Sequence, residues 1–125
     1  MLLSDKVKRL DEVFSRYVRL RDTRNGTGQC ITCGASIRFE TCDAGHYISR
    51  RHMATRWNEE NVHAQCVECN RYRYGNLQRY RRSLVQMYGA ELVAELERRK
   101  NLAVHVDGMM LDKLIKYFQQ KTKLL

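Results

Sequence analysis

The sequence contains two short cysteine pairs, Cys30-Ile31-Thr32-Cys33 and Cys66-Val67-Glu68-Cys69. In each pair the two thiolates lie about one turn apart, which suits half of a tetrahedral zinc site. A redox Cys-x-x-Cys motif needs only one pair in a βαβ setting, and this sequence lacks that setting. The two pairs therefore predict one structural zinc ion held by Cys30, Cys33, Cys66 and Cys69. We interpret the fifth cysteine, Cys42, as a small packing residue.

The chain is short and strongly basic. Its 125 residues include 23 Lys and Arg against 14 Asp and Glu, a formal net charge of +9. Nucleic acid is the commonest partner of so basic a protein. A hydrophobic content of 43% excludes a disordered tail and suits one packed domain. No run approaches the ~20 apolar residues of a membrane span.

The first residues turn charged at Asp5, so we expect no secretory signal. A protein that stays in the cytoplasm keeps its thiols reduced, which makes a disulfide framework unexpected. We predict a single domain over 1–125, made of an N-terminal helix (1–24), a zinc-containing core (25–76) and C-terminal helices (77–125).

Periodicity predicts the helices that flank the core. Apolar positions three or four apart predict a helix over 3–22, with Ser4 or Asp5 as its cap. Residues 25–28, Asn-Gly-Thr-Gly, break it. Gly89 is expected to end a helix that presents Leu77, Tyr80, Leu84 and Tyr88 on one face. A second helix follows over Ala90–Lys100, and Asp107 caps a last one.

Between the flanking helices the expected elements are shorter. Residues Ser36–Glu40 and Asp43–Ser49 predict a hairpin. A further helix is expected to open directly at the second cysteine pair, over 66–73.

The spacing of the pairs leaves room for a functional centre. Between Cys33 and Cys66 lie 32 residues, whereas a simple zinc ribbon separates its pairs by about 15–20. The intervening stretch holds the residue types that a catalytic centre needs, which a purely structural zinc module does not. These are Asp43, His46, His52, Asn58, Asn61 and His63.

Two runs, Gly45-His46-Tyr47-Ile48 and residues 61–70, resemble HNH endonucleases of the ββα-metal class, including phage endonuclease VII. The longer strings 42–50, 61–66 and 69–72 resemble the lambda NinG/Rap family of recombination endonucleases more closely. The resemblance implies an α+β fold, mostly α overall, in which helices flank a zinc-stabilised ββα-metal (HNH) core. It also implies metal-dependent hydrolysis of phosphodiester bonds in branched DNA, such as Holliday junctions and D-loops, in a phage or prophage.

The same resemblance assigns roles in the centre. His46 is the general base, since an unperturbed imidazole can be neutral at physiological pH. Asn61 braces the loop against the strand that bears His46. Asn70 is a ligand of a catalytic Mg²⁺ or Mn²⁺ ion. The alternative for His46 is a structural histidine in a zinc fold.

One position departs from the class. Many HNH enzymes carry an Asp metal ligand directly before the catalytic His, and here that position is Gly45. Asp43, two residues earlier on the strand, is our expected replacement. His52 and His63 are the alternatives, although His63 fits better as a hydrogen-bonded packing residue. His52 fits better as a phosphate contact or a surface residue.

Basic residues surround the expected centre. Arginines bind phosphate and tyrosines can stack on unpaired bases, although for any single residue a solvated helix face is the simpler interpretation. No base-reading helix stands out, which favours recognition of DNA shape. The expected contacts are Arg50, Arg51, Arg71, Tyr72, Arg73 and Arg79, with Tyr74, Tyr80, Arg81 and Arg82 interleaved.

Three questions stay open at this level. Cutting both strands of a junction needs two centres, which suggests a homodimer. Gly45 favours a different class, a noncatalytic zinc module that binds DNA or RNA as an accessory protein. An HNH nuclease that acts on ordinary duplex or single strands is a third possibility.

Overall fold

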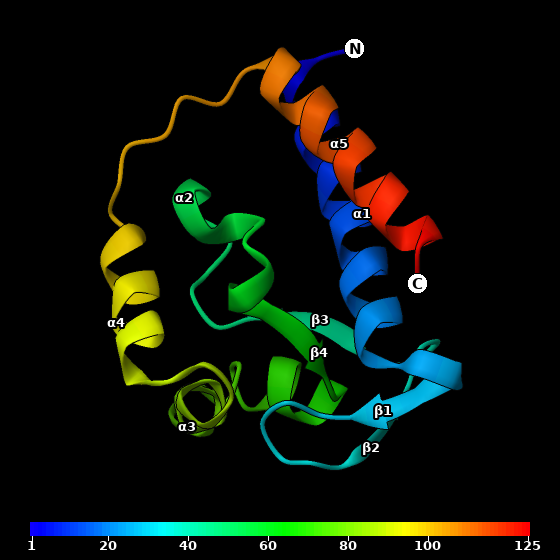
Figure 1. Ribbon diagram of the computed structural model, residues 1–125, viewed down its shortest axis with the longest axis vertical. Coiled ribbons are helices and arrows are strands. Elements are labelled where there is room, and N and C mark those ends of the chain that lie inside the picture. Colours follow the sequence, from blue (N-terminus) through cyan, green and yellow to red (C-terminus); the bar gives the residue numbers. More distant parts are fainter.

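A computed structural model describes residues 1–125. The chain begins with α1 (Leu3–Asp22) and ends with α3 (Leu77–Tyr88), α4 (Ala90–Arg99) and α5 (Gly108–Lys123). Two small antiparallel sheets lie between α1 and α3. In Figure 1, α1 and α5 lie side by side and run in the same direction, because α4 and a long connection return the chain across the molecule. The predicted mixed α+β, mostly helical composition is confirmed.

The first helix has the predicted bounds but not the predicted cap. It begins at Leu3 and is preceded by Leu2, which makes no side-chain cap bond, so Ser4 and Asp5 lie inside the first turn. The prediction that either residue caps α1 was therefore wrong. At the other end Asn25 and Gly26 adopt positive φ angles of 66° and 90°. This left-handed backbone ends the helical course and turns the chain into the first strand.

The predicted hairpin was wrong. Strand β1 (Thr27–Gln29) pairs with β2 (Ser36–Arg38), and β3 (Asp43–His46) pairs with β4 (Val62–Gln65). The first cysteine pair forms the turn between β1 and β2, where the Cys30 N–H donates to the Ala35 carbonyl at 2.8 Å. The strands predicted as one hairpin thus belong to different sheets. Strand β4 was not expected, because all four of its residues are buried and show no alternation.

The helical segment after β4 is shorter than the helix predicted there. Instead of a helix over 66–73, it forms one wide turn, Glu68–Tyr72, in which the Arg73 N–H donates to the Glu68 carbonyl five residues earlier. Tyr74, Gly75 and Asn76 then adopt positive φ angles of 52°, 89° and 49°. This reversal separates the turn from α3. The other short elements are α2 (Met53–Arg56) and the 3₁₀ turns Arg24–Gly26 and Glu59–Asn61.

The C-terminal helices follow their sequence signals. Gly89, with φ of +91°, ends α3 and precedes α4, as predicted. Helix α4 ends at Arg99, one residue before the expected end. The Asp107 carboxylate accepts a hydrogen bond from the Met110 N–H at 2.9 Å, which confirms Asp107 as the cap of α5.

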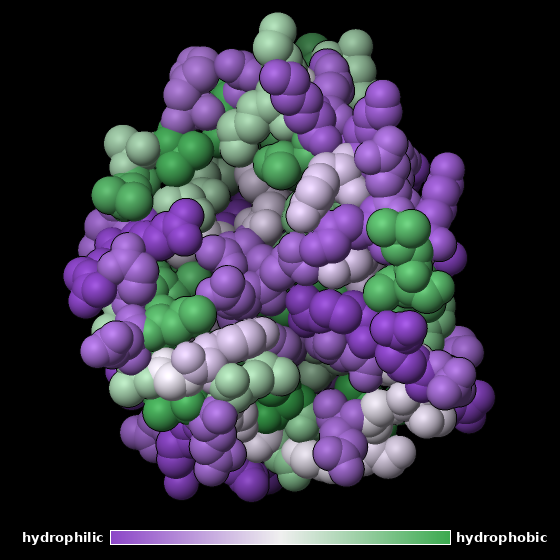
Figure 2. Space-filling view, viewed as in Figure 1, coloured by the Kyte–Doolittle hydropathy of each residue, from purple (hydrophilic) through white to green (hydrophobic).

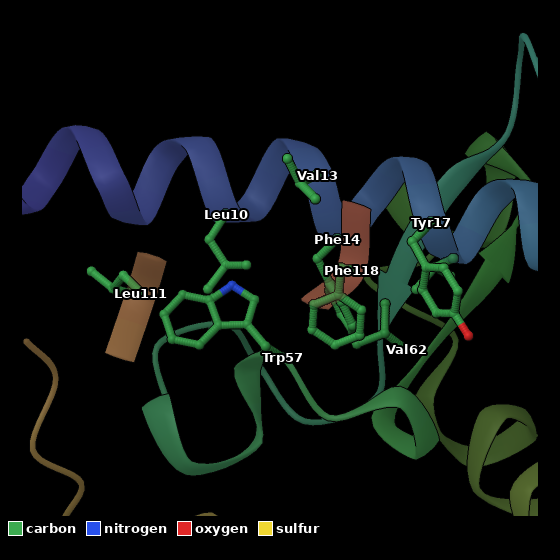
Figure 3. Packing of buried hydrophobic residues seen from close by; sticks show 9 residues of the cluster. Leu10, Val13, Phe14, Tyr17, Trp57, Val62, Leu111 and Phe118 are labelled. Carbon is green, nitrogen blue, oxygen red and sulfur yellow. The ribbon is translucent and has the colours of Figure 1, made fainter. Parts of the chain in front are cut away.

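The main core lies between α1, α5 and the β3–β4 region. Phe14 of α1 meets Phe118 of α5 edge to face, with ring centroids 4.8 Å apart. Figure 3 shows these rings together with Trp57 and Val62 beneath α1. This packing holds α1 against β3, so α1 forms one wall of the site described below. Cys42 is buried in a smaller cluster with Ile37 and Ala64, as its interpretation as a packing residue predicts.

No helix has both the length and the apolar character needed to cross a membrane. Hydrophilic side chains cover most of the face shown in Figure 2, with hydrophobic ones in separate small groups.

Candidate functional site

Four cysteines converge between the two sheets. The turn between β1 and β2 supplies Cys30 and Cys33, and the segment after β4 supplies Cys66 and Cys69. All four sulfur atoms lie within 4.8 Å of one another, and the Sγ atoms of Cys33 and Cys66 are 3.8 Å apart. Four Zn–S bonds of about 2.3 Å in a tetrahedron place the sulfurs about 3.8 Å apart. The cluster is therefore suited to a metal ion such as zinc.

Hydrogen bonds stabilise the thiolate of Cys30, whereas burial raises the pKa of the Cys33 and Cys66 thiols. The Cys66 N–H donates to the sulfur of Cys30 at 3.3 Å, and the Asn76 amide donates to that of Cys69 at 3.4 Å. Burial raises the pKa of the Cys30 thiol, but backbone donors from Cys33 and Cys66 outweigh it and lower that pKa to about 6. Donors that point at sulfur stabilise thiolates, the form that binds metal.

A polar cleft of about 580 Å³ lies between α1, β3 and the turn after β4. His46, Asp43 and Asn70 line it together with Arg50 and Arg71. The structure thus brings five of the predicted site residues to one place, from two separate parts of the chain, residues 43–50 and 70–71.

His46 is the last residue of β3, and its ring is oriented by a backbone carbonyl. Its Nε2 lies 2.9 Å from the carbonyl oxygen of Arg56. A carbonyl only accepts, so Nε2 carries the proton and Nδ1 is left as the unprotonated nitrogen. Nδ1 has no protein partner and is not sealed from solvent. Burial lowers the pKa of the imidazole to about 4, which keeps the ring neutral near pH 7.

Asp43 and Asn70 lie side by side in the cleft. The Asn70 amide nitrogen donates to Asp43 Oδ2 at 2.9 Å. Arg71 binds the same carboxylate through Nε at 2.9 Å and Nη2 at 2.8 Å. The Arg71 side chain is 63% exposed, so solvent screens this ion pair. The pair offers oxygen donors of the kind that Mg²⁺ or Mn²⁺ takes in proteins.

Asn61 is fully buried and ties the segment after β3 to the turn before β4. Its side-chain oxygen accepts from the Ile48 N–H at 2.8 Å. Its amide donates to the carbonyls of Ile48 at 3.0 Å and Thr55 at 3.1 Å. It therefore contacts the backbone that continues from His46 rather than the cleft itself.

Gly45 lies in β3 and packs against the Gln65 side chain of β4. A Cβ added there would overlap the side-chain carbonyl of Gln65, and the Tyr80 hydroxyl donates to the Gly45 carbonyl at 2.6 Å. The Gln65 Oε1 is itself buried without a hydrogen-bond partner. A carboxylate at position 45 would thus displace a buried side chain, which gives a packing reason for glycine.

Neither alternative histidine lies at the Asp43–Asn70 pair. His63 is buried, with Nε2 2.8 Å from the Tyr88 hydroxyl, and is the hydrogen-bonded packing residue that the sequence favoured. His52 precedes α2 and borders a different depression, with Glu97 and Lys100.

The other predicted nucleic-acid contacts lie outside the cleft. Tyr72 is 71% exposed, and Arg73 lies 3.5 Å from Glu68. Arg51 and Arg79 are exposed surface residues. Tyr80 is fully buried, so the expectation that it could stack on a base was wrong; Tyr74, 89% exposed, borders the cleft instead.

Sequence reasoning missed the residues that α1 brings to the cleft. The Asp11 carboxylate accepts from Arg56 Nε at 3.1 Å and from Trp57 Nε1 at 2.9 Å. It thereby anchors the residue whose carbonyl orients His46. Arg19 also borders the cleft. In the sequence both are ordinary polar positions of an amphipathic helix, so no local signal marks them.

These features define a mostly helical α+β protein with a four-cysteine cluster suited to a metal ion beside a polar cleft. The family model described as "NinG: Bacteriophage Lambda NinG protein" matches residues 2–125. The chain therefore belongs to the NinG family.

Two phage proteins called ninG are similar to this chain. The chain is 36% identical to protein ninG of Escherichia phage lambda over 96 residues, 76% of this chain and 45% of that protein. It is 35% identical to protein ninG of Salmonella phage P22 over 92 residues, 73% of this chain and 43% of that protein. The chain thus spans less than half the length of these relatives. No solved structure matches it.

Proposed function

We propose that this chain is a metal-dependent DNA endonuclease of the HNH type that hydrolyses phosphodiester bonds. The observation that carries the proposal is the convergence of His46, Asp43 and Asn70 in one cleft. The cleft combines an unprotonated ring nitrogen with two oxygen-bearing side chains and the arginines Arg50 and Arg71. These are the parts that phosphodiester hydrolysis requires.

In this proposal His46 acts as the general base. Its Nδ1 takes a proton from water while the water oxygen attacks phosphorus and the bond to the 3′ oxygen breaks. The hydrogen bond from Nε2 to Arg56 holds the tautomer that leaves Nδ1 free. Asp43 and Asn70 would hold Mg²⁺ or Mn²⁺, whose charge stabilises the leaving oxygen when it is bound. Asn61 positions the backbone that follows His46.

The four cysteines would hold a structural Zn²⁺ ion. Four thiolates would fill all four positions around it, which would leave no position open for substrate. The ion would clamp the β1–β2 turn to the segment that carries Asn70.

For the substrate we propose branched DNA, including Holliday junctions and D-loops, in the cytoplasm of a bacterial host infected by a phage or carrying a prophage. Membership of the NinG family supports this part. The proposed contacts are Arg50, Arg51, Arg71, Tyr72, Arg73 and Arg79. Because two strands must be cut, we propose that the protein works as a homodimer.

The test is cleavage of a labelled four-way junction in Mg²⁺ or Mn²⁺, with a linear duplex of the same sequence beside it. We expect the junction to be cut, and His46→Ala to lose at least about a hundredfold in rate, as loss of a general base does. His105→Ala is the matched control, because His105 lies on the exposed α4–α5 connection. Equal cutting of both substrates would contradict branch selectivity.

A noncatalytic, zinc-containing nucleic-acid-binding accessory protein is the second candidate. The observation that favours it is the pairing of both Asp43 oxygens with Arg71, together with the absence of a ligand at Gly45. Binding of the junction without cutting in either metal would support this candidate and contradict the nuclease.

A further inference from the structure

A second groove lies between α1 and the C-terminal end of α5. It has a volume of about 550 Å³. Four basic residues line it: Arg9, Arg16 and Arg19 from α1, and Lys123 from α5. Glu12 is the one acidic residue in its wall. We call it the α1 groove.

Most of the positive charge in the α1 groove is uncompensated. Arg9 lies 3.8 Å from Glu12, in an exposed contact. Arg16, Arg19 and Lys123 have no carboxylate within 4.0 Å. In the cleft, by contrast, Arg71 is paired with Asp43. Unpaired cations gathered in one groove repel one another, so an anion bound among them is stabilised.

Arg19 is held in place without losing its charge. Its Nε donates to the Ser15 hydroxyl at 3.2 Å, and Nη1 donates to the Phe39 carbonyl at 3.2 Å. The guanidinium lies 4.8 Å from the centroid of the Phe39 ring, and that of Arg16 lies 5.6 Å from it. A guanidinium already ordered by its neighbours loses less entropy when it binds a phosphate.

The α1 groove adjoins the polar cleft that contains His46. Arg19 borders both hollows, so they share a wall. Ten residues of helix separate Arg9 from Arg19, about 15 Å at 1.5 Å per residue. That length matches about four base-pair steps of duplex DNA. A polyanion of regular charge spacing, rather than a single small anion, fits a charged surface of this extent.

We infer that the α1 groove binds the phosphate backbone of the DNA arm next to the bond that is cut. The inference rests on the proposed nuclease function and adds a binding surface to it. The arm would lie along Arg9, Arg16 and Lys123, and Arg19 would contact the phosphates where the strand enters the cleft.

The experiment measures binding of a fluorescein-labelled four-way junction by anisotropy, without divalent ions, over a series of salt concentrations. The variant R9Q/R16Q/K123Q removes three charges and spares Arg19. R98Q/R99Q/K100Q, at the exposed end of α4, is the control that removes three charges outside both hollows. Thermal melting and light scattering check that both variants keep the fold and oligomeric state of the wild type.

We expect the groove variant to bind at least about tenfold more weakly at 0.1 M salt. The slope of log affinity against log salt should fall by about 2 to 3, because each lost phosphate contact contributes about 0.9. The control should keep the wild-type slope to within about 1. A groove variant with the slope of the wild type would overturn the inference.

Cleavage of the same junction in Mg²⁺ separates this outcome from failure of the proposed function. If the wild type cuts the junction while the groove variant keeps the wild-type salt slope, only the α1 groove is overturned. If the wild type binds the junction without cutting it and the salt slope of the groove variant falls as expected, DNA binding by the α1 groove is supported and the proposed nuclease activity is contradicted.

Discussion

His46 and His63 come from neighbouring paired strands, yet their surroundings give them different chemistry. Both have pKa values lowered to about 4 by burial. Nδ1 of His46 has no protein partner, whereas both ring nitrogens of His63 lie near tyrosine hydroxyls, at 2.8 Å from Tyr88 and 3.4 Å from Tyr80. Of the two, only His46 has a ring nitrogen without a protein partner, which the proposed role of general base requires.

The buried His63 predicts a loss of stability in mild acid. Its pKa falls from 6.5 in the unfolded chain to about 4 in the fold. The unfolded state therefore binds the proton more tightly, so the stability present above pH 6.5 is lost as the pH falls toward 4. We expect the unfolding free energy of the wild type to drop more steeply than that of His63→Gln, by about 1 kcal/mol per pH unit.

Urea unfolding at pH 7, 6, 5 and 4.5 checks this difference. His105→Gln, which removes an exposed histidine, is the matched control for the substitution. Parallel pH curves for the wild type and His63→Gln would show that His63 is not neutral and buried in solution.

At the scale of elements, the caps show how local signals succeed or fail. Asp107 precedes α5 in extended backbone and binds the Met110 N–H. Ser4 and Asp5 belong to the same residue class, but α1 begins earlier, at Leu3. A capping residue type therefore predicts the start of a helix only where the helix begins directly after that residue.

The cap of α5 predicts a measurable contribution to stability. Asp107→Ala should lower the unfolding free energy by about 1 kcal/mol, because the Met110 N–H loses its acceptor. Asp107→Asn should keep most of that energy, since an amide oxygen can accept the same bond. Chemical denaturation of the three proteins measures both effects. Equal losses in the two variants would assign the effect to the charge of Asp107, which lies 3.4 Å from His105.

At the scale of the whole molecule, the cysteine cluster joins parts that otherwise share little core. It connects the β1–β2 turn with the segment after β4, and the hydrophobic cluster around it contains five buried residues, two of which are Cys30 and Cys69 themselves. A metal ion there would stabilise the fold directly, because the unfolded chain has no preformed site.

We therefore expect one zinc ion per chain by elemental analysis. Cys33→Ser should lose that zinc and at least about 3 kcal/mol of stability, a fraction of the about 10–16 kcal/mol that zinc contributes in zinc-finger peptides. Cys42→Ala is the matched control, because Cys42 is buried outside the cluster and should keep the zinc. A metal-free wild type with the stability of the zinc-loaded protein would contradict a structural role.

The sequence alone determined several features of the fold and the cysteine site. The bounds of α1, the break at Gly89, the cap at Asp107 and the four-cysteine set follow from periodicity, turn residues and spacing. The helix bounds, the break and the cap depend on residues close together in the chain, and the cysteine set consists of two pairs that are each local. Membership of the NinG family agrees with the motif strings that suggested it.

Tertiary structure decided the pairing of the strands and the walls of the cleft. Strand β4 is buried on both faces and so carries no period, and β2 pairs with β1 across the cysteine turn rather than with β3. Asp11 and Arg19 enter the site only because the Phe14–Phe118 core packs α1 near β3. Such contacts join residues far apart in the chain, and their free energy depends on how whole elements pack rather than on any local pattern.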